Sequence, residues 1–108
     1  MPENAAILRC GYEALNTGDL STLAELFGDY GARLGHYVTE TGGTFRADLK
    51  RILTDEDGRV IGIHHDVAER DGKHLDVYGC TVFELENGRI VNGREHFYDL
   101  QAWDEFWS

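Results

Sequence analysis

The feature that most constrains the fold is a change in the spacing of apolar residues near Thr44. Before this residue, apolar side chains recur every three or four positions, as they do on one face of a helix. After it they alternate with polar side chains, which is typical of strands with one buried face. The second half also contains Asp71-Gly72 and Asn87-Gly88, and these residue types tolerate the positive φ angles of short hairpin turns. With the loop at residues 55–58, the turns predict four antiparallel strands joined as a meander.

Helices in the first half and a meander in the second half predict an α+β fold. We expect the helices to pack on a curved four-stranded sheet, and residues 1–108 to form one domain. Asp19 is the expected N-cap of the second helix, because its carboxylate can accept a hydrogen bond from the first turn. The predicted helices cover residues 3–17, residues 20–27 and a third segment that contains Tyr30, Leu34, Tyr37 and Val38. The predicted strands cover residues 44–53, 59–70, 73–86 and 89–99. The tail, residues 101–107, is expected to form a short amphipathic turn or helix.

The charge balance argues against some classes of partner. The formal net charge is −10, with 10 Lys and Arg against 20 Asp and Glu. Nucleic acids and anionic membrane surfaces require clustered basic residues, so we expect neither as a partner. No apolar run approaches the length of a membrane span and no secretion signal is recognisable, so we expect a cytoplasmic protein. In that compartment Cys10 and Cys80 are expected to be free thiols.

The pairing of the strands decides which side chains face the helices. Pairing across Asp71-Gly72 places His64 opposite Gly79. At Asn87-Gly88 two registers are open: a two-residue turn places Phe83 beside Asn92, whereas a type I turn with a glycine bulge places Phe83 beside Val91. We adopt the second register because it pairs apolar residues with apolar residues.

The inner face then carries titratable side chains in apolar surroundings. His64, Asp66 and Glu95 are expected to converge near Gly79, and a histidine beside carboxylates can act as a general base or hold one in place. These three are the candidate catalytic residues. The alternative is that they pair with one another or with arginines at the rim, namely Arg46, Arg51 and Arg94.

Further candidates are expected to line the same pocket. Trp103, together with Phe106 and Trp107, either plugs the open end of the sheet or lines the pocket. The candidate ligand-binding residues are Tyr12, Thr81, Phe97, Asp99 and Trp103.

The outer face of the predicted sheet is also substantially apolar, with Ile61, Ile63 and Val82 among its residues. A sheet that is apolar on both faces usually has a second layer, and no further element is left to supply it. We therefore expect a homodimer formed through the outer face. His65 and His96 also lie there, but they lack a recognised metal-ligand spacing, so no metal is expected.

Two stretches resemble the SnoaL-like family of the nuclear transport factor 2-like superfamily. Residues 12–20 (YEALNTGDL) and 23–27 (LAELF) are similar to the opening helices of that family. Residues 87–91 (NGRIV), 94–99 (REHFYD), Trp103-Asp104 and Phe106-Trp107 are similar to its last strand and tail. The resemblance covers nearly the whole chain. It implies a cone-shaped domain with a deep pocket, commonly dimeric and usually without a cofactor.

The chain departs from this family between Phe27 and His36, where relatives usually carry a strand and a hairpin-like loop. In ketosteroid isomerases that stretch supplies the general-base aspartate, and no residue here matches it. The isomerase's oxyanion tyrosine falls nearest Gly11, one position from Tyr12, and its protonated aspartate falls at Thr81. Steroid isomerisation is therefore not expected. In polyketide cyclases a His and an Asp act from the pocket, and the resemblance offers His64 and Asp66 as counterparts by the face on which they lie, not by motif.

Two classes of function remain open from the sequence. The first is a cofactor-independent isomerase, cyclase or hydratase that acts on a small apolar carbonyl compound. Glu95 or Asp66 would be its base, His64 the partner of that base, and Tyr12 a hydrogen-bond donor to a developing oxyanion. The second is a non-catalytic domain, which either binds a small molecule or only dimerises around a filled pocket.

Overall fold

The computed structural model describes residues 4–108, so the predicted helix start at Glu3 lies outside the described residues. It confirms the α+β fold, with four helices and four strands among those residues. The elements in chain order are α1 (Asn4–Thr17), α2 (Leu20–Phe27), α3 (Asp29–Glu40), β1 (Arg46–Thr54), β2 (Val60–Arg70), β3 (Lys73–Glu86), β4 (Arg89–Phe97) and α4 (Leu100–Trp107).

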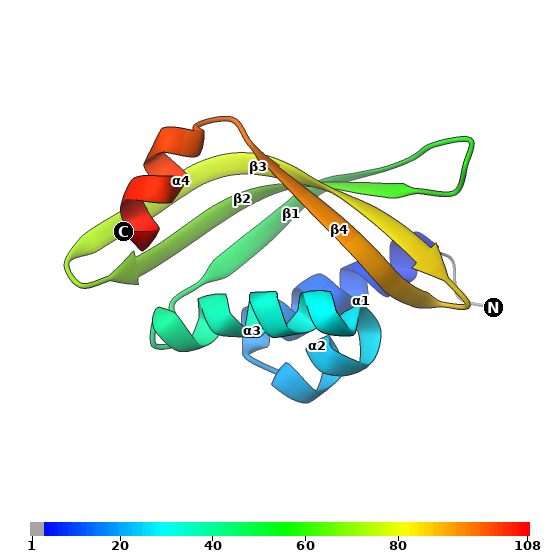
Figure 1. Ribbon diagram of the computed structural model, residues 1–108, viewed down its shortest axis with the longest axis horizontal. Coiled ribbons are helices and arrows are strands. Elements are labelled where there is room, and N and C mark those ends of the chain that lie inside the picture. The colour runs from blue at the N-terminus through cyan, green and yellow to red at the C-terminus, as the bar shows by residue number, and fades with distance from the viewer. Residues whose placement is uncertain (1–3) are drawn as a thin grey trace.

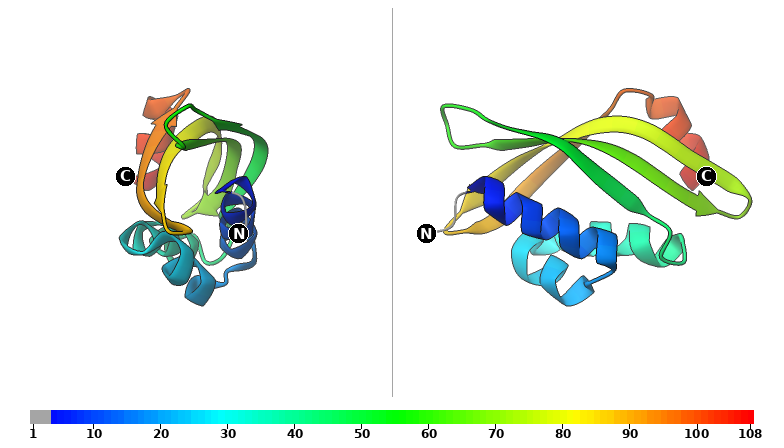
Figure 2. Two further views of the ribbon diagram at one scale, coloured as in Figure 1. Left: turned by 90° about the vertical axis from the view of Figure 1, so that its right-hand side faces the viewer. Right: turned by 180° about the vertical axis from the view of Figure 1, so that it is seen from behind.

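The strands form one antiparallel sheet in the order β1-β2-β3-β4, as the meander predicted. The sheet is strongly curved, and α1, α2 and α3 lie along its concave side (Figures 1 and 2). The fourth helix lies near the turn that joins β2 to β3. There Arg70 and Lys73 donate hydrogen bonds to the backbone carbonyl oxygens of Phe106 and Ser108. This arrangement encloses the concave face between helices on one side and α4 at one end.

Local sequence signals fix how the first helices join the sheet. The carboxylate of Asp19 accepts a hydrogen bond from the backbone N–H of Thr22, which confirms the predicted N-cap of α2. The Asn16 side chain bonds both the N–H and the carbonyl oxygen of Ala47, at 2.7 and 2.9 Å, and so ties the end of α1 to β1. A Cβ atom at Gly31 would lie 2.5 Å from the carbonyl oxygen of Leu23, so only glycine allows α3 to pack this closely on α2.

The turn between β3 and β4 is not of the type on which the predicted register depends. Asn87 and Gly88 both have positive φ angles, 52° and 77°, which is the geometry of a two-residue hairpin turn, not of a type I turn with a glycine bulge. The strands pair at once across this turn, and the irregularity falls further along, where Leu85 pairs with Ile90 but Glu84 pairs with Asn92. The extra residue in the bulge is therefore Val91.

This bulge corrects two predictions and preserves a third. Phe83 faces Gly93, so the predicted pairing of Phe83 with Val91 is wrong. Val91 was expected on the inner face, but it is 52% exposed, and Ile90 is buried in its place. The extra residue shifts the alternation of inward and outward side chains along β4 by one position. Glu95 therefore still faces the interior, and it pairs with Thr81.

The convex face of the sheet has no helix over it among the described elements (Figure 2). Ile61, Ile63 and Val82 lie on this face with intermediate exposure, and Tyr78 is 44% exposed. The structure contains one chain, so the expected dimer through this face stays a prediction. Cys10 and Cys80 are free cysteines, in agreement with the sequence analysis. None of the described helices is long and apolar enough to cross a membrane.

Candidate functional site

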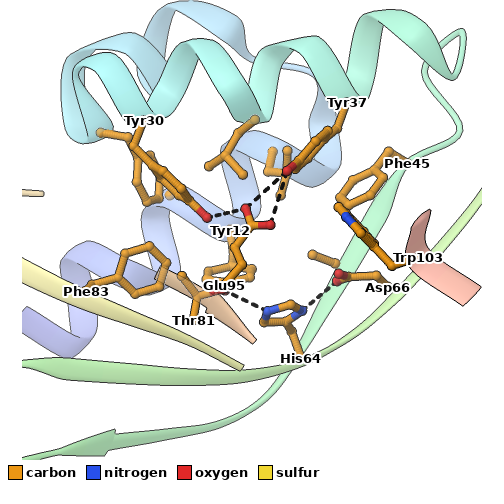
Figure 3. A pocket seen from close by; sticks show the side chains of 15 residues that line it. Tyr12, Tyr30, Tyr37, Phe45, His64, Asp66, Thr81, Phe83, Glu95 and Trp103 are labelled. Atoms are coloured by element: carbon orange, nitrogen blue, oxygen red, sulfur yellow. Dashed lines mark hydrogen bonds and ion pairs between the residues drawn. The ribbon is translucent and has the colours of Figure 1, made fainter. Parts of the chain in front are cut away.

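A small cavity lies between the helices and the concave face of the sheet (Figure 3). The volume inside it that the centre of a water molecule can reach is about 20 Å³. A space of that size holds about one water molecule, so the cavity is nearly filled by its own side chains. Its lining residues are Gly11, Tyr12, Leu15, Phe27, Tyr30, Leu34, Tyr37, Phe45, Ala47, His64, Asp66, Thr81, Phe83, Glu95 and Trp103. Six of the eight candidate site residues are therefore brought together.

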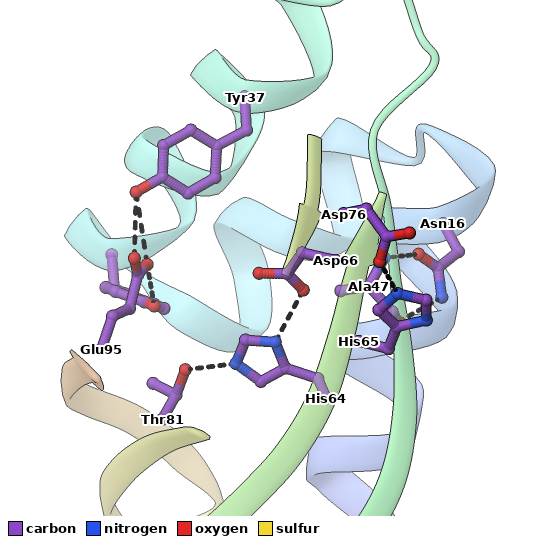
Figure 4. A network of polar contacts seen from close by, with 10 residues as sticks. Asn16, Tyr37, Ala47, His64, His65, Asp66, Asp76, Thr81 and Glu95 are labelled. Atoms are coloured by element: carbon purple, nitrogen blue, oxygen red, sulfur yellow. Dashed lines mark hydrogen bonds and ion pairs between the residues drawn. The ribbon is translucent and has the colours of Figure 1, made fainter. Parts of the chain in front are cut away.

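The first polar group in the cavity is built from β2 and β3. His64 and Asp66 are two residues apart on β2, so both side chains point to the same face, and they are only 4% and 2% exposed. His64 Nδ1 lies 2.6 Å from Asp66 Oδ1, and His64 Nε2 lies 3.0 Å from the Thr81 hydroxyl (Figure 4). When Asp66 is ionised, it accepts a hydrogen bond from Nδ1–H. In the neutral imidazole, Nε2 is then left as a proton acceptor.

The second polar group joins α3 to β4. Tyr30 and Tyr37 are seven residues apart, or two helical turns, so both rings project from the same side of α3. The Tyr30 hydroxyl donates to Glu95 Oε1 at 2.5 Å, and the Tyr37 hydroxyl donates to Glu95 Oε2 at 3.1 Å. Both tyrosines were used in the sequence analysis only as part of a helical pattern. The i, i+7 spacing put them on one face, but nothing in the sequence placed that face over Glu95.

The surroundings of the three cavity tyrosines keep their hydroxyls protonated. Burial raises the pKa of Tyr12 well above its ordinary value, and the charge of Asp66 adds to the effect. Burial raises the pKa of Tyr30 and Tyr37 in the same direction, with the charge and hydrogen bond of Glu95 as further causes. All three hydroxyls are therefore hydrogen-bond donors at neutral pH.

Asp66 has a perturbed acidity of its own. Burial raises the pKa of Asp66 above its ordinary value, although the hydrogen bond and charge of His64 oppose the shift. A carboxyl whose pKa is higher in the folded chain binds more protons when folded, in the pH range between the two pKa values. Its stabilising contribution is therefore fully present below the unfolded pKa, near pH 4, and is lost as the pH rises through the folded pKa.

We expect the Asp66→Asn variant, which cannot ionise, to lack this pH dependence. Relative to the wild type, its free energy of unfolding should rise as the pH increases from about 4, because only the wild type must bury a charge. Urea denaturation at a series of pH values measures the difference. Asp76→Asn is the matched control, because Asp76 also pairs with a histidine, His65, but its side chain is 76% exposed. Parallel pH curves for Asp66→Asn and the wild type would contradict the assignment.

Two candidate residues lie outside the cavity. Asp99 does not extend β4, which ends at Phe97, but caps α4 by accepting a hydrogen bond from the Ala102 N–H at 3.0 Å. Asp99 was expected to bind a ligand in the pocket, but its carboxylate is exposed, is used in the cap and does not line the cavity. Phe97 does not line the cavity but stacks on Trp103, with ring centroids 3.9 Å apart, and so holds that indole in the cavity wall.

The site acids do not pair with the arginines at the rim. Arg46 donates instead to the backbone carbonyl oxygens of Gly43 and Phe45. None of the described residues that line the cavity is Lys or Arg. Asp66 instead contacts His64, and Glu95 is held by tyrosine hydroxyls.

A larger open groove borders the cavity between α3 and α4. Its volume is about 510 Å³, and its residues include His36, Glu40, Arg70 and Asp104. Tyr37 and Trp103 line both this groove and the cavity, with their rings perpendicular and their centroids 5.3 Å apart. These two rings are therefore the boundary between the enclosed space and the open groove.

Comparison with known proteins places the chain in a family. It is similar to Bal32a from a soil-derived mobile gene cassette, with 51% sequence identity over 97% of this chain and 96% of that one, and a TM-score of 0.89. It also matches the fold of a SnoaL-like polyketide cyclase from Agrobacterium tumefaciens, with 12% identity over the full length of both chains and a TM-score of 0.78. A nuclear transport factor 2-like protein of Burkholderia pseudomallei matches at 15% identity over both full lengths, with a TM-score of 0.75.

The chain belongs to one family with Bal32a, and it shares its fold with SnoaL-like polyketide cyclases and nuclear transport factor 2-like proteins. No protein-family model matches the sequence, and no curated protein matches it. Among the described residues only Gly28 lies between α2 and α3, and no strand separates these two helices.

Proposed function

We propose that this protein binds a small apolar carbonyl compound in the cavity and isomerises, cyclises or hydrates it by acid–base chemistry without a cofactor. The observation that carries the proposal is the buried His64–Asp66 pair in a cavity walled mainly by aromatic and aliphatic side chains. Burying such groups is unfavourable, and groups with perturbed acidity cluster at functional sites. Similarity of fold to a SnoaL-like polyketide cyclase supports a small-molecule ligand.

In the proposed mechanism, the base is His64 and its positioning residue is Asp66. The His64 Nε2 atom takes a proton from the carbon next to the ligand's carbonyl, the C–H electron pair forms an enolate, and Nε2–H later returns the proton to another atom. Tyr12 donates a hydrogen bond to the enolate oxygen. Of the two carboxylates predicted as bases, Glu95 is the weaker candidate, because both its oxygens already accept hydrogen bonds from tyrosines and would have to give these up to reach a ligand's proton.

Entry of a ligand requires the cavity to widen from its filled state. We propose that Tyr37 and Trp103 move apart, since they separate the cavity from the groove between α3 and α4. The ligand then occupies space that these rings fill in its absence.

The small volume of the cavity also supports a second function. A space of about 20 Å³ is what a filled pocket would have, so the chain could be a binding or dimerisation module without catalysis. The two functions differ in one measurable property, because only the enzyme exchanges the protons of a bound ketone with solvent.

Deuterium exchange tests the proposal without knowledge of the natural substrate. The wild-type protein would be incubated in D₂O with cyclohexanone and a panel of other small cyclic ketones, and NMR would follow binding and the loss of α-proton signal. We expect at least one ketone to bind and to exchange faster than in buffer. Binding without exchange would contradict the enzyme and favour the binding domain, and no binding at all would favour the dimerisation module.

We also propose that the protein is a homodimer through the convex face of the sheet, because Ile63, Val82 and Tyr78 leave an apolar surface there. Sedimentation at micromolar concentration is expected to give twice the chain mass of 12.2 kDa. Val82→Glu should give a monomer, because it places a charge on the interface. Leu20→Glu on α2, at a position that is 46% exposed, is the matched control and should remain dimeric. A monomeric wild type would contradict the proposal.

A further inference from the structure

The charges of the cavity are unbalanced. Its lining contains two carboxyl groups, Asp66 and Glu95, and neither Lys nor Arg among the described residues. Asp66 is paired with His64, which can carry a positive charge, but the partners of Glu95 are the neutral hydroxyls of Tyr30 and Tyr37. Glu95 is half-buried, and carboxylates that are withdrawn from water are normally paired with a cation. A carboxylate without one is a site at which a cationic group of a ligand would be stabilised.

The hydrogen bonds around Glu95 also restrict what can bind there. Each tyrosine has one O–H, and both are already donated to the carboxylate. What this group can offer a ligand is therefore acceptors: the remaining lone pairs of Glu95 and those of the two phenol oxygens. A carbonyl oxygen would find no donor in it. An ammonium group, which has three N–H donors and no acceptor, matches it.

The rings near Glu95 suit a cation as well. Tyr37 lies 5.3 Å from both Phe45 and Trp103, measured between ring centroids, so three aromatic rings meet at this end of the cavity (Figure 3). The faces of aromatic rings attract organic cations, and indole and phenol rings do so most strongly.

The route from solvent carries further negative charge. Glu40 and Asp104 line the groove outside Tyr37 and Trp103. Arg70 is also in the groove, but it lies 5.8 Å over the Trp107 ring and donates to the carbonyl oxygen of Phe106, so it is directed at α4. The formal net charge of −10 further raises the local concentration of cations.

We infer that the ligand of this cavity carries a protonated amine as well as a carbonyl group, and that Glu95 binds the amine. This inference rests on the proposed function, since it assumes that the cavity is the ligand site. The two polar groups then have separate tasks: Glu95 and its tyrosines hold the ammonium end, and His64 and Tyr12 act at the carbonyl end.

Three probes on one ring test the inference: cyclohexylamine, cyclohexanone and cyclohexanecarboxylate, titrated into the wild-type protein and followed by NMR. We expect the amine to bind at least about tenfold more tightly than the ketone, the gain typical of a charge-assisted hydrogen bond, and the carboxylate not to bind. An amine that binds no more tightly than the ketone would overturn the inference while leaving the proposed function intact. If none of the three binds in the cavity, the inference fails, and the proposed function fails with it only when no ketone of the panel binds there either.

Glu95→Gln sharpens the test, because it removes the charge and keeps the shape. The amine should lose about tenfold or more in affinity, whereas the affinity for the ketone should change little. Glu84→Gln, at an exposed position on β3, is the control and should change neither affinity. Unchanged amine affinity in Glu95→Gln would overturn the inference. If that variant does not fold, the wild-type comparison of the three probes decides alone.

Discussion

Replacing His64 with glutamine is expected to slow the exchange of a bound ketone's α-protons by about 10²- to 10⁴-fold, the range usual for loss of a general base. The glutamine amide can still bond Asp66 or Thr81, but it cannot take up a proton at neutral pH. Ligand affinity should change much less than the exchange rate, because glutamine is a polar side chain of similar length and the other lining residues are unchanged. NMR of the ketone in D₂O, at saturating concentration, measures the rate directly.

The neighbouring residue provides the control. His65 also pairs with an aspartate, Asp76, and it stacks on Tyr78 with ring centroids 4.4 Å apart, but it points to the opposite face of the sheet (Figure 4). His65→Gln should therefore leave the exchange rate at the wild-type value. Equal rates in His64→Gln and the wild type would remove His64 from the mechanism.

The largest effect on stability is expected from Trp103→Ala. The indole is 8% exposed, stacks on Phe97 and packs edge-on against Tyr37. Removing a buried aromatic side chain of this size typically lowers the free energy of unfolding by about 3–5 kcal/mol, a large share of the stability of a small domain. The same change would join the cavity to the groove outside it.

Urea denaturation measures this loss. Leu100→Ala is the control on the same helix, because Leu100 is 58% exposed and its truncation should have little effect. A loss below about 1 kcal/mol for Trp103→Ala would mean that α4 does not close the cavity as described, since such values are typical of surface positions.

The sequence contained enough to place the first polar group. Strand alternation puts His64 and Asp66 on one face whatever the rest of the chain does, and the turn at Asp71-Gly72 sets their partners on the next strand. The same pairing places Thr81 on the inner face of β3, close to His64. These are local rules, and they need no knowledge of the helices.

Features that depend on long-range packing could not be obtained in this way. The bulge at Val91 arises because Ile90 and Phe83 both find space in the core, which the identity of the turn residues does not reveal. The bonds from Tyr30 and Tyr37 to Glu95 depend on the path of α3 across β4. Asp99 has a side chain suited both to a pocket and to a helix cap, and only the early end of β4 decides between them.

We propose that a small ketone binds in the enclosed space beside His64. Intermolecular NOEs between the isotope-labelled protein and the ketone of the panel that binds most tightly locate the bound ligand. We expect NOEs to cavity rings, above all those of Tyr12, Tyr37 and Trp103. NOEs confined to Ile63 and Val82 on the convex face, or none at saturating ketone, would contradict it.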